Sequence, residues 1–474
     1  MNLRRLTELL TSPDSARTLD RTLPWLFLCF ALPVMFWVAL AVPPGQSPDE
    51  AAQIARAASV LHPQIAGHRG GMVQVQDHQE PSLTLTANFA PVKLALTPSN
   101  PPPYYGWVLR KALQSAPWDH GATQVDAPNT AVYPPFLFLP AGLALAYAHV
   151  FQQTPFDAVL DARITDAVCY ALLGMLALLL ARRGKILLFL LLCLPTALWL
   201  GGTVHQDGLM IGLTILAVAL LTDAEHSHAR LWAAAVALAL VILARPPLLP
   251  LALLIAVPVG LRSSWRPLLL AALPGLLWTL LVVPHVAVPF YIGPPTHGGP
   301  LWEGDPTRIF PLADPDSQAH ILLSHPGLLI TLPIATLMND WSVRLSEIFK
   351  IVGALNVALP DFIEALGIIA LLAALAALGR EAPLSRLKPI AALLAAALIL
   401  IYAAQYLSWT HVGAAQVDGV QGRYFLELLP FLALAGAPRP GRPLLALPAI
   451  ALGAAGLIVV PWTIVQTYYM YSGR

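Results

Sequence analysis

Charged side chains are scarce in this sequence. Asp, Glu, Lys and Arg make up 11% of its 474 residues, whereas soluble domains carry about 25%. Hydrophobic residues make up 57% of the chain, and its mean hydropathy is +0.67. Because so few charges cannot cover a surface that faces water, most of the surface must face lipid. The composition therefore predicts an all-α integral membrane protein with many spans.

Other absences narrow the range of functions. The net charge is +1, so no broad field attracts nucleic acid, and no nucleic-acid partner is expected. The three cysteines lie within apolar runs and read as core residues rather than a disulfide framework. The sequence has no phosphate-binding glycine loop, and its histidines lack the spacing of zinc ligands, so neither a cytoplasmic nucleotide site nor a metal cage is predicted. Residues 23–42 are too long for a signal-peptide core and precede no small-residue cleavage site, so we expect a retained first span.

Eleven apolar segments approach the length of about 20 residues that crosses a bilayer. They are residues 23–43, 164–182, 186–203, 208–222, 230–245, 247–261, 267–289, 361–379, 389–407, 425–437 and 443–465. Two further segments, 134–152 and 326–338, fit either a span or a helix along the interface. The sequence thus predicts one polytopic helical bundle, residues 1–474, with about 11–13 transmembrane helices.

Basic residues give the orientation, because short loops rich in Lys and Arg stay in the cytoplasm. Threading the eleven segments in order places five basic clusters on one side: Arg4/Arg5/Arg17/Arg21, Arg182/Arg183/Lys185, Arg262/Arg266, Arg380/Arg386/Lys388 and Arg439/Arg442. We therefore predict a cytoplasmic amino terminus and an external carboxyl terminus. Three segments then face outward: a long loop with interfacial helices at 44–163, a second long loop at 290–360, and the short 408–424.

Two carboxylates stand just outside the first predicted span. Asp49 and Glu50 lie in the run GQSPDEAAQ, after Pro43, Pro44 and Pro48. One interpretation is an exposed helix start, with Ser47 as the cap of a helix that begins at Pro48. The other is a carboxylate held at the membrane boundary as a general base or metal ligand.

A second acid opens a later span. Asp207 follows His205 and Gln206 at the outer end of the segment that begins at residue 208. It is either a helix-start acid or a second polar group that faces the same cavity as Asp49.

Two arginines lie on the outer side, against the charge bias. Arg245 ends the predicted span 230–245, and Arg423 lies in the run QGRYF, between Gln421 and Tyr424. Each could be an interfacial anchor, Arg245 by reaching toward lipid headgroups and Arg423 together with Tyr424. Alternatively, the two guanidinium groups bind a phosphate at headgroup level.

In order along the chain, four motifs resemble those of one bacterial family of membrane proteins, the domain-of-unknown-function 2142 family. They are Ser-Pro-Asp-Glu at 47–50, Tyr-Pro-Pro at 133–135, His-Gln-Asp at 205–207 and Gln-Gly-Arg-Tyr-Phe at 421–425. The resemblance covers about residues 23 to 465. The chain departs from the family where Gln53 stands in place of a His, where His205-Gln206-Asp207 replaces an Asn-x-Asp setting, and where 351–360 lacks a Trp.

The family is similar in layout to the GT-C superfamily of membrane glycosyltransferases that use lipid-linked phosphosugars. The resemblance implies a GT-C-like enzyme of the bacterial inner membrane, with its active site facing the periplasm or exterior. It would move a sugar from a polyprenyl-phosphate donor to an envelope glycan or lipid, among membrane lipids. Asp49 would be the catalytic base, Glu50 a supporting acid, and Asp207 a residue that orients the acceptor or holds Mg²⁺ or Mn²⁺. Arg245 and Arg423 would bind the phosphate, and the remaining substrate-binding residues would be Gln421, Tyr424, His205 and Tyr133.

Two other functions remain open at this stage. A transporter or flippase of envelope precursors also needs many spans, but transporters place ionisable residues near the bilayer midplane and show paired halves. Here the acids gather on one face, which favours chemistry at the surface. A non-catalytic protein of envelope assembly is the third interpretation, because the carboxylate motifs are short.

Overall fold

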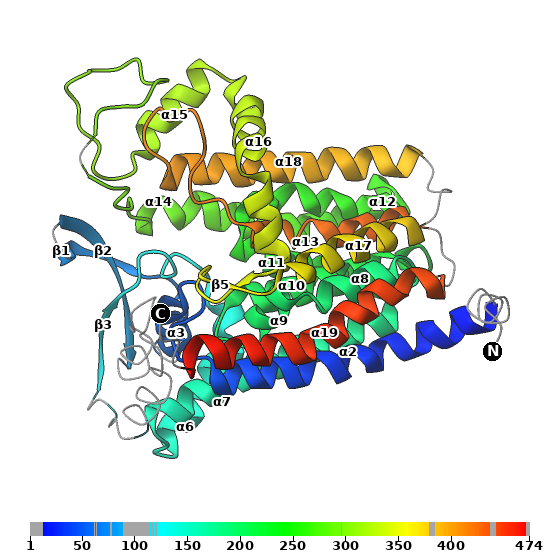
Figure 1. Cartoon of the computed structure of the whole chain (residues 1–474). Helices are drawn as coiled ribbons and strands as arrows, with labels where there is room; N and C mark the ends of the chain where they lie inside the picture. Colours follow the sequence, from blue (N-terminus) through cyan, green and yellow to red (C-terminus); the bar gives the residue numbers. More distant parts are fainter. Residues whose placement is uncertain are drawn as a thin grey trace.

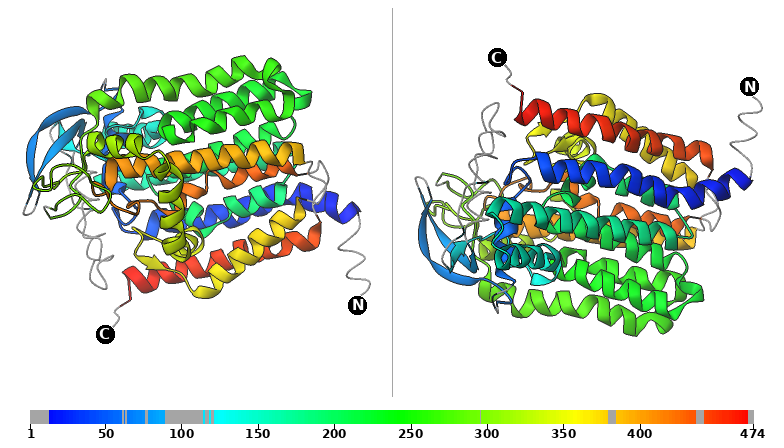
Figure 2. Two further views of the ribbon diagram at one scale, coloured as in Figure 1. Left: turned by 90° about the horizontal axis from the view of Figure 1, so that it is seen from above. Right: turned by 90° about the horizontal axis from the view of Figure 1, so that it is seen from below.

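The chain folds into a bundle of long helices that run side by side (Figures 1 and 2). The computed structural model describes residues 13–60, 62, 64–75, 78–88, 114, 118, 121–294, 296–378, 384–436 and 442–470. Within these residues, five helices are long and apolar enough to cross a membrane: α2 (Pro13–Ala41), α7 (Pro155–Leu180), α13 (Leu261–Leu281, extended by α14, Val283–Val286), α18 (Leu384–Trp409) and α19 (Pro443–Tyr468). The predicted class, an all-α polytopic membrane protein, is confirmed.

Two bent pairs of helices raise the number of candidate spans to seven. α9 (Pro195–Gly201) meets α10 (Gln206–Leu221) at 116°, and α15 (Pro315–Ser324) meets α16 (Leu328–Phe349) at 108°. The bundle also contains shorter helices: α8 (Lys185–Leu192), α11 (His228–Ala244), α12 (Ala256–Val259) and α17 (Asp361–Ala377). Backbone breaks of this kind are tolerated at membrane depth only inside protein or beside a water-filled cavity.

Several segments that the sequence presented as separate spans are interrupted. The segment 186–203 is divided between α8 and α9 just before Pro195, and 247–261 is mainly a 3-10 helix, η3 (Pro246–Ile255). The segment 425–437 forms parts of two 3-10 helices, η4 (Gly422–Phe425) and η5 (Leu429–Ala435). Prolines stand at or inside each interruption, where a missing N–H and a ring clash prevent a continuous α-helix.

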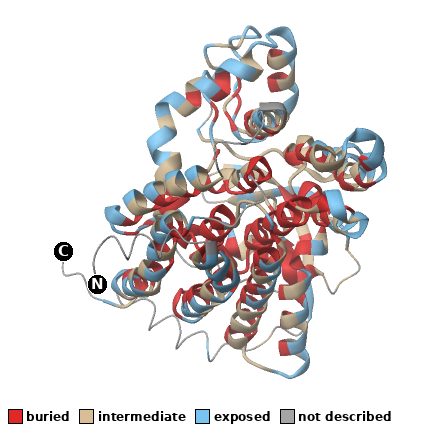
Figure 3. Ribbon diagram, turned by 90° about the vertical axis from the view of Figure 1, so that its right-hand side faces the viewer, coloured by how far each residue is buried: buried red, intermediate tan, exposed pale blue. Residues whose placement is uncertain are grey.

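The interrupted helices form the centre of the bundle. Every residue from Ile186 to Leu192 of α8 is buried, and so is nearly all of α10. The long helices surround them and expose large apolar side chains, among them Leu172, Leu280 and Ile458. Figure 3 shows buried segments in the interior and exposed ones at the periphery. Apolar side chains on the periphery are expected where the surrounding medium is lipid.

A small antiparallel sheet covers one end of the bundle (Figure 1). Its strands are β1 (His68–Val75), β2 (His78–Asn88) and β3 (Ala122–Asp126), in the order β1-β2-β3. Alternate residues of β2 are buried, including Leu83 and Leu85, in a cluster shared with α3 (Glu50–Ser59) and α6 (Leu139–Val150). The first outward segment was expected to hold interfacial helices, and the structure adds this sheet to them. The sheet packs against α3, which in turn packs against α6 at this end of the bundle.

The two ambiguous segments are also helical. Residues 135–150 form η1 (Pro135–Phe138) and α6, which packs against α3 and α7 at the sheet end. The segment 326–338 forms most of the first half of α16, which runs across the long helices in Figure 1. A second antiparallel pair, β4 (Ile351–Val352) and β5 (Val357–Ala358), follows α16, and η2 (Ala224–His226) precedes α11.

The basic clusters meet at the end opposite the sheet. Glu225 forms ion pairs with Arg183 and Arg386 at 3.1 and 3.0 Å, and Lys185 donates to the carbonyl of Asp20 near the start of α2. Arg4, Arg5, Arg380 and Arg439 lie outside the described residues. The grouping agrees with the expectation that one end of the bundle is the basic one.

The order of helices leads to a prediction about topology. α2 begins at the basic end, whereas α19 ends near the sheet, where the Tyr469 hydroxyl donates to the carbonyl of Ala41. Fusions of a phosphatase, active only outside, and of a fluorescent protein, active only inside, test the ends. We expect the amino terminus to read as cytoplasmic and a reporter after Arg474 to read as external, because basic loops are retained inside. Both reporters reading the same side would contradict the prediction.

Candidate functional site

Asp49 occupies a strained turn between α2 and α3. Its φ of 55° and ψ of 16° lie in the left-handed region, which non-glycine residues rarely adopt. The expected cap by Ser47 is wrong: α3 begins at Glu50 and has Asp49 as its N-cap residue, whose side chain makes no capping hydrogen bond. Ser47 Oγ instead lies 3.1 Å from Thr203 Oγ1. The Asp49 carboxylate, with 46% of its side chain exposed, is therefore available for other contacts.

The second acid lies just after the break between α9 and α10. His205 is the N-cap residue of α10, and its Nδ1 accepts a hydrogen bond from the Asp207 N–H over 3.0 Å. Because a ring nitrogen that accepts carries no proton, this cap fixes the state of Nδ1. The Asp207 side chain is buried, and a buried carboxylate needs cationic partners.

Arg245 supplies the first of these cations. It ends α11, before Pro246, and its Nη2 lies 2.7 Å from Oδ1 of Asp207. Its Nη1 pairs with the carboxylate of Glu427, which is fully buried. The guanidinium lies over the ring of Tyr424, 4.6 Å from its centroid. Arg245 is thus held by two buried carboxylates and does not extend toward lipid headgroups.

Arg423 supplies the second cation and reaches both acids. Its Nε lies 3.3 Å from Oδ2 of Asp207, and its Nη2 lies 3.6 Å from Oδ2 of Asp49. Its Nη1 is 3.4 Å from Nε2 of His205. The Nε of Arg423 and Oδ2 of Asp207 are close without hydrogen-bond geometry, and neither has a hydrogen bond within the described part of the chain. These contacts are looser than those of Arg245.

A glycine and a glutamate fix the turn that carries Arg423. The N–H of Gly422 donates to Oε2 of Glu347 over 2.5 Å, and Glu347 also pairs with Arg344 at 2.8 Å. A Cβ on Gly422 would lie 2.4 Å from the Arg344 carbonyl oxygen, so only glycine fits against α16. The end of α16 therefore sets the position of η4 and of its arginine.

The structure brings most of the predicted substrate-binding residues to this cluster. Tyr424 lies beside both arginines, with its ring 5.6 Å from the Arg423 guanidinium. Tyr133 is close enough that its pKa responds to the charges of the cluster; burial, the larger cause, raises the pKa, so the phenol stays protonated near neutral pH. Gln421 begins the turn, and its buried Oε1 has no hydrogen bond within the described part of the chain.

The charges of the cluster limit what it can bind. Asp49, Asp207 and Glu427 stand against Arg245 and Arg423, so the carboxylates outnumber the guanidinium groups. A phosphate that enters must share these guanidinium groups with carboxylates already in place. The role of the arginines as phosphate ligands stays a prediction.

Glu50 lies apart from this cluster. Its carboxylate pairs with Arg163 of α7, with the Nε and Nη2 of Arg163 at 2.8 and 2.7 Å. It also accepts hydrogen bonds from the backbone N–H groups of Gly45 and Val204. Arg163 donates further to three carbonyls at the end of α2, those of Ala39, Val42 and Pro43. Glu50 therefore joins α2, α3 and α7 through Arg163. Its role as a supporting acid stays a prediction that these contacts do not favour.

Two residues of these networks were missed by reasoning from the sequence. Glu427 follows Arg423 by four residues, and Arg163 immediately precedes a predicted span. Both are ionisable residues at or within segments assigned to the membrane, which is the signal that could have identified them.

A metal site is not assembled by the described residues. No three His, Cys, Asp or Glu side chains among them are grouped so that they could hold an ion. Asp49 and Asp207 both lie against Arg423, whose positive charge opposes a cation there. Dependence on Mg²⁺ or Mn²⁺ stays a prediction that these contacts do not favour.

Separate roles for the adjacent acids lead to a stability prediction. Arg163→Met leaves Glu50 buried without a counter-charge, which costs about 3–5 kcal/mol. Asp49→Asn removes only a half-exposed partner at 3.6 Å, a change of about 1 kcal/mol or less. We expect a clearly lower apparent melting temperature for Arg163→Met than for Asp49→Asn, measured in detergent by size-exclusion chromatography after heating. Equal melting temperatures would remove the structural role of the Arg163–Glu50 pair.

Comparison with known proteins gives the family. No curated protein and no solved structure matches the chain. A family model described as a predicted membrane protein, DUF2142, matches residues 32–432, which include all four motifs and both arginines of the cluster. The chain therefore belongs to the DUF2142 family of predicted membrane proteins.

Proposed function

We propose that this protein is a membrane glycosyltransferase that moves a sugar from a polyprenyl-phosphate donor to a cell-envelope glycan or lipid. The transfer would take place on the outer face of the bacterial inner membrane. The observation that carries the proposal is the meeting of Asp49, Asp207, Arg245 and Arg423. These residues come from four separate parts of the chain and form one ion-pair cluster beside helix breaks.

The chemistry assigns the base to Asp49. Its carboxylate is half exposed and sits in a strained backbone, whereas Asp207 and Glu427 are buried and paired. Asp49 takes the proton of the acceptor hydroxyl as that oxygen forms its bond to the anomeric carbon. The bond from the anomeric carbon to the phosphate oxygen breaks, and its electron pair leaves with the polyprenyl phosphate. Asp207 lies 3.3 Å from Nε of Arg423 and positions that guanidinium for the donor phosphate.

Of the two arginines, Arg423 is the better candidate for the leaving phosphate. Arg245 makes a close contact of 2.7 Å with Asp207 and a further pair with Glu427. Arg423 makes only contacts of 3.3 to 3.6 Å, so a phosphate displaces less when it binds there. A guanidinium at this position stabilises the negative charge that develops on the leaving group.

The position of α16 supports a lipid-linked substrate. Its side chains Ile330, Ile334 and Met338 are exposed and apolar, as a helix in contact with lipid requires. The same helix ends against Gly422, next to Arg423. The exposed apolar face of α16 therefore leads to the turn that carries Arg423.

The arrangement favours chemistry over transport. The cluster lies near the sheet end, because Asp49 follows the end of α2 and immediately precedes α3. Transporters place such groups near the midplane, between repeated halves. The flippase and assembly interpretations stay as the outcomes that a negative result would favour.

The test is a glycan comparison in the host. Deleting the gene should remove one sugar from an envelope glycan or lipid, and wild type should restore it. Asp49→Asn should be produced at normal levels and fail to restore it, because an amide cannot accept the proton. The matched control is Asp161→Asn, which lies outside the cluster and should restore it fully. Mass spectrometry of envelope lipids and polysaccharides gives the readout, and full rescue by Asp49→Asn would exclude the assigned base.

The two arginines should differ in the same assay. Arg245→Met removes the guanidinium that pairs with the buried carboxylates of Asp207 and Glu427. We expect a loss in the free energy of unfolding of about 3–5 kcal/mol, visible as low yield and a lower melting temperature. Arg423→Gln keeps the Arg245 pairs, so yield should stay close to wild type while the sugar is lost. A folded Arg423→Gln variant with a normal glycan would show that Arg423 binds no phosphate in the reaction.

A further inference from the structure

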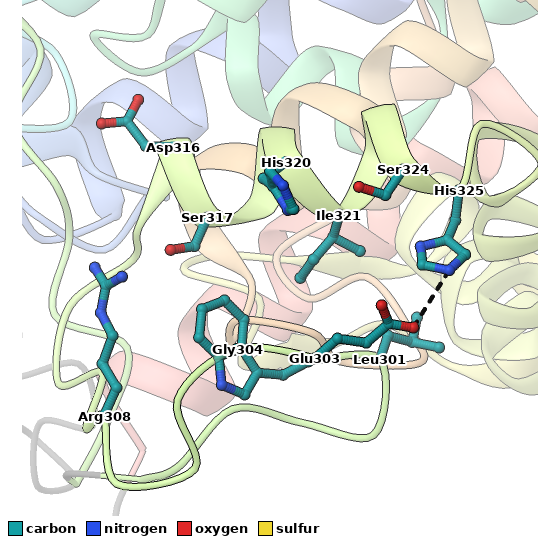
Figure 4. Close-up of a pocket in the computed structure, with 11 residues that line it drawn as sticks. Leu301, Glu303, Gly304, Arg308, Asp316, Ser317, His320, Ile321, Ser324 and His325 are labelled. Carbon is teal, nitrogen blue, oxygen red and sulfur yellow. Dashed lines mark ion pairs between the residues drawn. The ribbon is translucent and has the colours of Figure 1, made fainter.

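We infer that a pocket on the second outer segment binds a neutral oligosaccharide, away from the ion-pair cluster. The pocket has a volume of about 450 Å³ and lies between α15 and the loop that precedes it. Volumes of 300–1,000 Å³ are typical of small-molecule sites. In Figure 4, Ser317 and Ile321 point from α15 toward the loop of Leu301 and Glu303, and His325 Nε2 lies 3.5 Å from Oε1 of Glu303.

The floor of the pocket is apolar and held in place. Leu301, Trp302 and Ile321 line it, and the Trp302 ring stands edge-on to Phe310 with centroids 5.0 Å apart. The indole Nε1 donates to the carbonyl of Asp305. A Cβ on Gly304 would lie 2.0 Å from the indole, so the loop is shaped around this ring. A fixed aromatic surface is what the apolar C–H face of a sugar ring packs against.

The rim is polar and suits hydroxyl groups. Glu303 offers carboxylate acceptors, His320 and His325 each offer a donor and an acceptor when neutral, and Ser324 offers both. These groups match the hydroxyl groups of a saccharide, each of which can both donate and accept a hydrogen bond.

The charge of the lining argues against an anion. Its charged side chains are Glu303, Asp316 and Arg308. Arg308 is already paired with Asp314 and lies over the rings of Phe310 and Trp302, 4.6 and 5.9 Å from their centroids. With two carboxylates and one neutralised guanidinium, the pocket repels a phosphate. The ligand class is therefore an uncharged saccharide and not the phosphate of a lipid donor.

The pocket is attached to the chain that leads to the ion-pair cluster. The side chain of Gln318 donates to the carbonyls of Thr410 and His411 and accepts from the N–H of Gly413. The N–H of Leu301 donates to the carbonyl of Gly413. From there the chain runs to Gly422 and Arg423. If the bound oligosaccharide is the acceptor of the transfer, that role rests on the proposed function. The binding of an oligosaccharide in this pocket does not.

The experiment is saturation-transfer NMR on the full chain in nanodiscs, with maltotriose, cellotriose and chitotriose as probes and inorganic phosphate as the anionic control. At least one trisaccharide should bind, and phosphate should not compete. Trp302→Ala and His320→Ala should each weaken binding about tenfold or more. Because His320 is exposed on α15, its replacement tests the pocket even if Trp302→Ala fails to fold. The control Trp341→Ala removes an exposed indole outside the pocket and should leave binding unchanged.

Absence of binding by all three sugars, or equal binding by wild type and His320→Ala, would overturn the inference. Asp49→Asn separates it from the proposed function, since that variant should bind the sugar as wild type does. Sugar binding together with an unchanged glycan in the deletion strain would retain the pocket and reject the transferase. Loss of a glycan in the deletion strain, without sugar binding by the protein, would retain the transferase and reject the pocket.

Discussion

The interior of this protein depends on buried charge being paired at the places where helices break. Arg245 lies between Asp207 and Glu427, and Arg423 joins Asp207 to Asp49. Removing one partner of such a set leaves a charge in a medium that cannot solvate it. The four segments that carry these residues therefore hold one another in position. The cluster is at once a structural junction and a place where several ionisable groups face a common point.

The breaks between helices also leave backbone N–H groups without helical partners, and polar side chains accept their hydrogen bonds. Glu50 accepts from the N–H groups of Gly45 and Val204, and Glu347 accepts from Gly422. His205 accepts from the first turn of α10. Inside a membrane protein an unsatisfied N–H costs several kcal/mol, so each of these acceptors stabilises a turn that could not exist without it. The turns in question are those that present Asp49, Asp207 and Arg423.

Two structural elements, the sheet and α15 with its loop, are attached to the segments that carry the cluster. The sheet packs Leu83 and Leu85 against α3, which begins next to Asp49. On the other side, α15 and its loop are fastened to residues 410–413 by Gln318. The first connection ties the sheet to the helix beside Asp49, and the second ties α15 to the chain that leads to Arg423. An enzyme that joins a lipid-bound donor to a water-soluble or envelope acceptor needs a site at the boundary between lipid and water. In the proposal, the ion-pair cluster carries out the transfer and the pocket beside α15 binds the sugar.

The sequence by itself determined the membrane class, because low charge and long apolar runs leave a chain no other stable environment. Its four motifs pointed to the family that the family model confirms. The sequence also pointed to Asp49, Asp207, Arg245 and Arg423, since charges placed beside spans stand out against an apolar background. It presented several interrupted segments as continuous spans, because apolar runs in buried, broken helices look the same as runs that face lipid. Only the tertiary structure decided that Asp49 faces the cluster while its neighbour Glu50 turns inward to Arg163. That difference arises from the left-handed backbone at Asp49 and from a partner more than a hundred residues away, which no local pattern encodes.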